Sequence, residues 1–202
     1  MEYHPHDGLA KLVLGKLARG RDVIPEAEMR VPISGDVVLR PGNPLPNWTG
    51  LLGRLVGTGL TVLEFYHGRP RAPDLVRARA KGELACALEL EKTKGFDGVS
   101  RCRVLVIMIG GAKRPRLRAY GAASWLQLDA GYHVFESDPQ HVHLDLLRLK
   151  VTLETAWVHV AGNGPKLEEA LRLLVQTGPE DVKRLLWELS EEVTFMPEIQ
   201  AT

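Results

Sequence analysis

The chain has 202 residues, of which 45% are hydrophobic and 25% are charged, and its formal net charge is +1. This composition can bury the core of one ordinary domain, and the net charge gives no indication of nucleic-acid binding. Two cysteines, Cys86 and Cys102, are too few for a disulfide scaffold and lack a metal-ligand spacing, so we expect reduced thiols. No signal-peptide pattern and no apolar run near the roughly 20 residues of a membrane span is present, which predicts a soluble cytoplasmic protein.

The expected secondary structure follows from apolar periodicity and from turn residues. In chain order we predict a helix over 8–18, strands over 27–33 and 35–41, a short helix or irregular segment over 48–59, a buried strand over 60–66, a helix over 74–92 capped by Asp74, a central strand over 101–111, a strand over 131–136, a strand or short helix over 143–152, a strand over 155–163, and helices over 166–178 and 179–193.

This order predicts an α/β fold, borderline with α+β, in which a mixed sheet is flanked by helices. We expect a single domain over residues 1–202. Within it, residues 1–120 would form the core, and residues 121–202 would be a C-terminal extension packed on that core.

Two carboxylates on strands are the main candidates for chemistry. Asp36 opens one predicted strand, and Glu64 ends the next one in the stretch TVLEFY. If these strands are neighbours, both carboxylates converge at one end, where a hard divalent cation would neutralise them. The helix that follows carries Arg77 and Lys81 four residues apart, hence on one face. The alternative is that Asp36 is a turn residue and Glu64 pairs with a surface arginine.

Two other groups of residues, histidines and basic side chains, are weaker candidates for a functional site. His141 and His143 would share one face of a strand, but no ligand set accompanies them, so we interpret them as surface or capping histidines. Basic residues are unevenly distributed: residues 101–118 hold six Lys and Arg and no acid, and residues 69–81 hold five with one acid. Such segments form either a solvated surface or one that contacts phosphates.

The ordered patterns resemble the PD-(D/E)XK phosphodiesterase superfamily, and within it the group of recombination-promoting nucleases and transposase-related proteins. The matching stretches are HPHDGLAKLVLG, GDVVLRP, GLLGRLV, TVLEFYHG, DLVRARAKGEL and LETAWVHVAGNG. The resemblance implies a restriction-endonuclease-like core in which Asp36, Glu64 and the Phe65 carbonyl hold Mg²⁺ or Mn²⁺. It also implies that the attacking water is assisted by a lysine two residues after the glutamate, where this chain has Tyr66. A lysine relocated to the following helix would be Lys81.

Two hypotheses follow from this resemblance. The first is a metal-dependent DNA endonuclease, with catalytic Asp36, Glu64 and Lys81. Its phosphate contacts would come from Arg69, Arg71, Arg77, Lys113 and Arg114. The second is a catalytically silent protein of the same fold that serves as a nucleic-acid-binding or protein-interaction scaffold. A homodimer is compatible with both.

Overall fold

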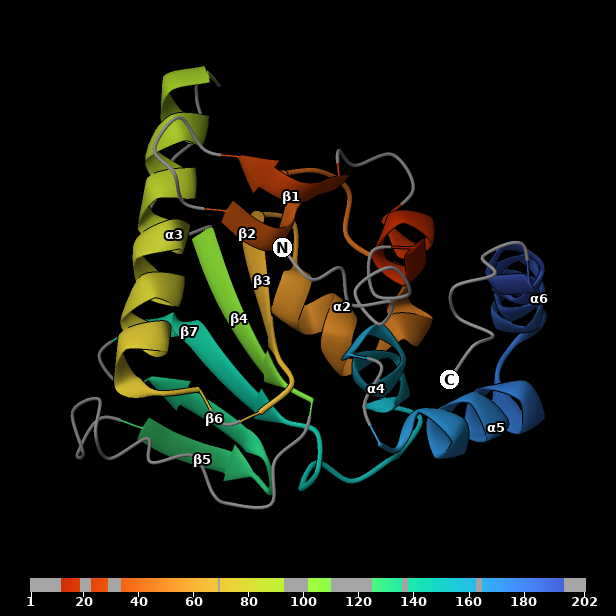
Figure 1. The fold of residues 1–202 in the computed structure, drawn as a ribbon. Coiled ribbons are helices and arrows are strands. Elements are labelled where there is room, and N and C mark those ends of the chain that lie inside the picture. The colour runs from red at the N-terminus through yellow and green to blue at the C-terminus, as the bar shows by residue number, and fades with distance from the viewer. Residues whose placement is uncertain are drawn as a thin grey trace.

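A mixed α/β architecture is present in the computed structural model of the protein, which describes residues 12–18, 23–28, 34–68, 70–92, 102–109, 125–135, 138–162 and 165–194. Among these residues, seven strands form one sheet in the order β1-β2-β3-β4-β7-β6-β5, and helices lie on both of its faces (Figure 1). The predicted fold class, a mixed sheet flanked by helices, is confirmed.

The strands are β1 (Val23–Glu28), β2 (Ser34–Leu39), β3 (Leu60–Tyr66), β4 (Cys102–Met108), β5 (Trp125–Asp129), β6 (Tyr132–Phe135) and β7 (Asp138–Asp145). The helices are a first segment over residues 12–17, the 3-10 helix η1 (Asn47–Thr49), α2 (Leu51–Val56), α3 (Ala72–Lys92), α4 (Ala156–Gly162), α5 (Leu167–Thr177) and α6 (Glu180–Thr194).

The sheet combines antiparallel and parallel pairing. Strands β1, β2 and β3 are antiparallel neighbours, whereas β4 runs parallel to both β3 and β7. The connection from β3 to the parallel β4 includes helix α3, as a parallel pair requires a crossover. Beyond residue 120, β7, β6 and β5 continue the same sheet, because β7 pairs directly with β4.

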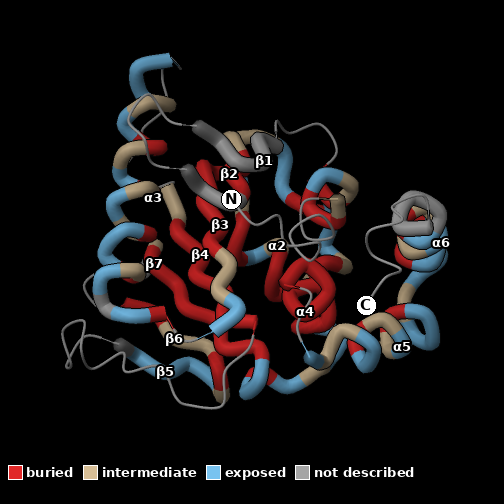
Figure 2. The backbone as a smooth tube through the Cα atoms, viewed as in Figure 1, coloured by how far each residue is buried: buried red, intermediate tan, exposed pale blue. Residues whose placement is uncertain are grey.

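The central strand is β4, which confirms the prediction for residues 101–111. Its residues from Val104 to Met108 are buried on both faces of the sheet, as is usual for a strand between two parallel neighbours (Figure 2). Such strands consist of a continuous apolar run rather than an alternating one, which is why the sequence identified this strand clearly.

Helix α3 covers one face of the sheet (Figure 1). Its buried residues Leu75, Ala78, Gly82 and Ala85 recur at intervals of three and four, which is the spacing of one helical stripe. The helix starts at Ala72, two residues before the predicted cap. Asp74 instead lies in the first turn, where its carboxylate accepts a hydrogen bond from the Arg71 amide at 2.8 Å.

The opposite face of the sheet is covered by helix α4, which corrects the prediction of a strand over residues 155–163. All seven residues of α4 are buried, between the sheet and helices α2 and α5 (Figure 2). A helix buried on every side has no polar face, so its sequence lacks the 3.6-residue periodicity that would distinguish it from a short buried strand.

The two cysteines correct a second prediction. Cys86 of α3 and Cys102 of β4 form a disulfide, with their Cα atoms 6.0 Å apart. Sixteen residues separate them in the sequence, and the parallel crossover brings them together. The expectation of reduced thiols was therefore wrong for this structure, because cysteine number and spacing do not reveal which residues a crossover brings together.

Candidate active site

Glu64 lies beneath helix α3 near the end of β3. Leu60 and Val62 precede it on the same face of the strand and pack against Ala85 and Cys86 of the helix. Glu64 continues this alternation but introduces a carboxylate, and only 3% of the residue is exposed. The strand has therefore not reached the surface at this position, so the carboxylate needs a partner of opposite charge.

Lys81 of α3 supplies that partner. Its Nζ donates to Glu64 Oε2 at 2.6 Å, and the lysine and glutamate side chains are 17% and 4% exposed. The sequence left open a surface arginine as the partner of Glu64, and the partner found among the described residues is this lysine of α3. Of the two cationic residues predicted to face the site together, only Lys81 does so. Arg77 is directed to Asp74 and its side chain is 69% exposed.

A close approach of α3 to β4 positions Lys81. The next residue, Gly82, lies so near Val104 that a methyl group in its place would overlap the valine Cγ2. Absence of a side chain at position 82 thus lets the helix axis come close to the sheet. A lysine on this turn can then reach a carboxylate that starts from the strand below it.

Asp36 lies at the register position beside Glu64. Strands β2 and β3 pair Val37 with Leu63 and Val38 with Val62, so one further step along β2 places the Asp36 backbone next to Glu64. The side chain of Asp36 lies outside the part that the structure describes. Directly opposed residues on antiparallel strands have Cβ atoms about 4.5–5.5 Å apart, which is close enough for two carboxylates to share one cation.

The Phe65 carbonyl belongs to the same edge of β3. The neighbouring Tyr66 carbonyl accepts a hydrogen bond from the Ile109 amide, which follows β4, at 2.8 Å. Because successive carbonyls of a strand point to opposite sides, the Phe65 carbonyl points toward the β2 side, where Asp36 lies. The backbone of Asp36, the Glu64 carboxylate and the Phe65 carbonyl therefore lie at adjacent positions of two strands.

Tyr66 fastens the end of β3 to the start of α3. Its hydroxyl donates to the Asp74 carbonyl at 3.2 Å. The Asp74 carboxylate also binds the side chains of Arg71 and Arg77 at 3.3 and 3.5 Å. Burial raises the pKa of Asp74, but the hydrogen bonds from Arg71 and the charges of both arginines outweigh it and hold this pKa below its ordinary value.

The predicted phosphate-contacting residues are only partly described. The Arg71 and Arg77 side chains are 77% and 69% exposed, so both guanidinium groups can meet a ligand on the α3 surface. Arg69, Lys113 and Arg114 lie outside the described residues.

The interpretation of His141 and His143 as surface histidines was wrong. They are 1% and 0% exposed on β7, an interior strand of the sheet that lies between β4 and β6. Burial, together with the nearby His133 and His141, lowers the pKa of His143 from 6.5 to about 3. The His143 ring is therefore a neutral part of the core near pH 7. Within the described ranges, no group of three or more His, Cys, Asp or Glu is placed to hold a metal ion.

One buried carboxylate was not singled out from the sequence. Asp145 at the end of β7 is 1% exposed, and it accepts hydrogen bonds from the Leu147 amide and pairs with Arg148, each at 3.1 Å. Burial raises the pKa of Asp145 and outweighs these contacts. The spacing HVHLD, in which polar residues alternate along a strand next to the central one, was the available signal.

Comparisons with family models, with curated proteins and with solved structures found no match to the chain. Over the described residues, no helix has both the length and the apolar character needed to cross a membrane. The function is therefore argued from the geometry around Glu64.

Proposed function

We propose that the protein is a metal-dependent phosphodiester hydrolase of the PD-(D/E)XK type, acting on DNA. The observation that carries this proposal is the buried pair of Glu64 and Lys81, at 2.6 Å, in the same cross-strand row as Asp36. Three antiparallel strands, a crossover helix and a fourth, parallel strand are also the order that the resemblance implies for the catalytic core.

The donor set suits a hard divalent cation. Asp36, Glu64 and the Phe65 carbonyl would offer only oxygen atoms, and Mg²⁺ is usually held by one or two carboxylates with waters completing its shell. When bound, such an ion lowers the pKa of a coordinated water and stabilises negative charge on a phosphate. The chain itself holds the two acidic residues on rigid, paired strands, which fixes the distance between them.

Lys81 gives the site the cation that position 66 lacks. Its ammonium group holds the Glu64 carboxylate in place beneath α3 and brings positive charge to the point where a phosphate would approach. The exposed guanidinium groups of Arg71 and Arg77 on the same helix would contact further phosphates of the substrate. Binding of this kind weakens as salt concentration rises, because counterions are released from the nucleic acid.

The test is cleavage of plasmid and single-stranded DNA with Mg²⁺ or Mn²⁺, comparing the wild type with Glu64→Ala. We expect cleavage that requires the ion and is lost in this variant. A matched control is Glu83→Gln, because Glu83 is an exposed carboxylate on α3 that pairs with Arg79. Equal cleavage by the wild type and Glu64→Ala would show that the activity does not come from this site.

A catalytically silent scaffold of the same fold is the second candidate. It is favoured by the neutralisation of Glu64 by Lys81 and by the use of Tyr66 to fasten α3 rather than to face a substrate. Titration with Mn²⁺ separates the two, since a ligand that binds only the folded state raises the melting temperature. A melting temperature that is unchanged by Mn²⁺, with no heat of binding, supports the scaffold.

A further inference from the structure

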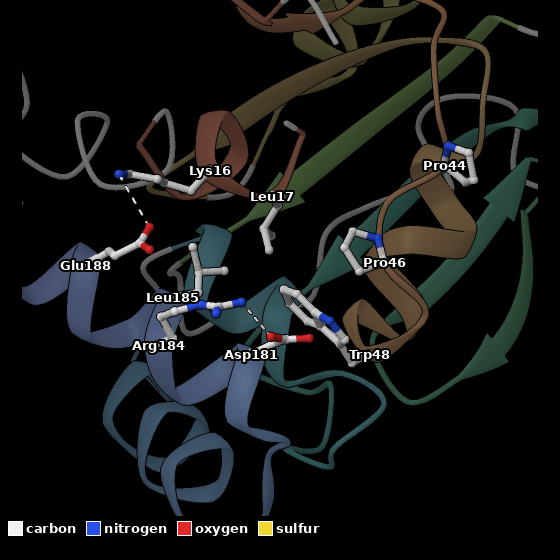
Figure 3. Close-up of a pocket in the computed structure, with 9 residues that line it drawn as sticks. All are labelled: Lys16, Leu17, Pro44, Pro46, Trp48, Asp181, Arg184, Leu185 and Glu188. Carbon is white, nitrogen blue, oxygen red and sulfur yellow. Dashed lines mark hydrogen bonds and ion pairs between the residues drawn. The ribbon is translucent and has the colours of Figure 1, made fainter. Parts of the chain in front are cut away.

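A cavity of about 350 Å³ lies away from Glu64, between the helical segment 12–17, the loop before η1 and helix α6 (Figure 3). Leu17 and Leu185, which line it, belong to the large core cluster on the opposite face of the sheet from α3. The volume is within the range of about 300–1,000 Å³ that is usual for small-molecule sites. The proposed hydrolase chemistry leaves this cavity without a role.

The apolar wall of the cavity is rigid. Pro44, Pro46 and Trp48 form one side, and proline has a fixed backbone torsion. Trp48 packs against the fully buried Trp157 with the ring centroids 5.3 Å apart, and the Thr49 hydroxyl donates to the Pro46 carbonyl at 2.6 Å. These contacts hold the loop against the core, and the cavity lies beside the indole ring.

The rim of the cavity carries two ion pairs, each made of one basic and one acidic side chain. Lys16 lies 3.7 Å from Glu188, and Arg184 lies 2.6 Å from Asp181 (Figure 3). The four groups sum to zero charge. Both pairs are partly exposed to solvent, and such pairs contribute at most about 1 kcal/mol to stability, so a ligand can open them at little cost.

We propose that this cavity binds a small aromatic zwitterion, of the class of the free aromatic amino acids. The ring would stack on Trp48, where an aromatic pair gains attraction beyond its buried area. The ligand carboxylate would pair with Arg184 and its ammonium group with Asp181, the two partners of the more exposed ion pair. A ligand with only one charge would separate this ion pair and give a new partner to only one of its two members. A zwitterion gives each of the two separated rim charges a new partner of opposite sign.

The experiment is isothermal titration calorimetry of the full chain with L-tryptophan, tryptamine, indole-3-propionate and alanine. We expect a dissociation constant below about 1 mM for L-tryptophan. Tryptamine lacks the carboxylate, indole-3-propionate lacks the ammonium group and alanine lacks the ring, so each should bind at least tenfold more weakly. Absence of binding by L-tryptophan, or equal binding of either singly charged indole, overturns the proposal.

Two charge variants locate the site without disturbing the apolar wall. Arg184→Gln and Asp181→Asn should each weaken the binding of L-tryptophan at least tenfold. The matched control is Lys183→Gln, since Lys183 pairs with Glu180 on the same helix at 2.7 Å but does not line the cavity. Unchanged binding by both cavity variants, or equal weakening by the control, overturns the assignment. Melting temperatures near the wild-type value verify that each variant is folded.

The result is independent of the proposed hydrolase. Arg184→Gln should leave the Mn²⁺ titration and the DNA-cleavage assay unchanged, and Glu64→Ala should leave L-tryptophan binding unchanged. Failure of one proposal therefore does not imply failure of the other.

Discussion

Replacing Lys81 by methionine should destabilise the protein and, at the same time, expose the chemical role of Glu64. Methionine keeps much of the length of the lysine side chain but removes its charge. Because the Glu64 side chain is only 4% exposed, its carboxylate would lose the ammonium group 2.6 Å away without gaining comparable solvation. The variant thus tests whether this buried ion pair matters for folding.

The magnitude follows from the burial of the pair. Removing one partner of a buried pair costs about 3–5 kcal/mol, and the 17% exposure of the Lys81 side chain places the expected cost at roughly 2–3 kcal/mol. For a chain of this size, such a change lowers the melting temperature by about 5–10 °C. Urea denaturation at pH 7 measures the free energy of unfolding directly.

A double-mutant cycle with Glu64→Gln isolates the interaction itself. Removing both charges leaves no unpaired ion, so the double variant should be more stable than the sum of the single effects predicts, by at least about 1 kcal/mol. The control is Glu83→Gln, which opens the exposed Arg79 pair on the same helix and should cost less than about 0.5 kcal/mol. A coupling energy below about 0.3 kcal/mol would refute the argument that burial makes the Glu64–Lys81 pair strong.

The same variant separates the two proposed functions. If Glu64 binds a cation, Mn²⁺ should raise the melting temperature of Lys81→Met more than that of the wild type, because the ion replaces the missing ammonium charge. If the site cleaves DNA as proposed, the variant should nevertheless cleave poorly, since it lacks the ammonium group expected to meet the phosphate. No Mn²⁺ effect on either protein is the outcome that the scaffold function predicts.

Three further predictions concern the packing of α3 and the core histidine. Gly82→Ala should lower the free energy of unfolding by about 1–3 kcal/mol despite the better helix propensity of alanine, because the methyl group overlaps Val104. Adding Val104→Ala to this variant should recover part of the loss, as measured by urea denaturation. A Gly82→Ala variant of unchanged or higher stability contradicts the close approach. Reduction of the Cys86–Cys102 disulfide should lower the free energy of unfolding by about 3 kcal/mol, as expected for a loop of some 15 residues, and dithiothreitol should have no such effect on Cys86→Ser. His143 has a folded pKa of about 3 against an ordinary 6.5, so its contribution to stability is complete above pH 6.5 and is lost as pH falls toward 3. His143→Gln should reduce the slope of stability against pH in this window by up to about 1.4 kcal/mol per pH unit, and an unchanged slope contradicts the burial argument.

The elements around the candidate site could be predicted because their patterns are strong. The apolar run of β4 and the long amphipathic stripe of α3 each match a single structural class. Placing Lys81 on the helix after Glu64 then needed only the order of the elements. Helix α4 was not predictable in the same way, because its buried stretch AWVHVAG has no polar side to mark a helical period.

Other features depend on contacts between distant parts of the chain. The disulfide and the burial of His143 both result from the parallel pairing of β4 with its neighbours, which the sequence alone does not specify. The partner of Glu64 was likewise left open. The close approach of helix α3 to β4 at Gly82 brings Lys81 within reach of the Glu64 carboxylate.

Two attachments of α3 to the sheet, one on each side of Lys81 in the sequence, fix the position of this lysine. Asp74 and Cys86 anchor the helix to Tyr66 of β3 and to β4, and Lys81 lies between them. Seven residues, or about two helical turns, separate Asp74 from Lys81, so both lie on the stripe that faces the sheet. Tyr66 therefore has a structural role at the end of β3. By holding the first turn of α3 it fixes the rotation of the helix, and that rotation directs the ammonium group to Glu64. The tyrosine on the strand and the lysine on the helix act as two parts of one arrangement.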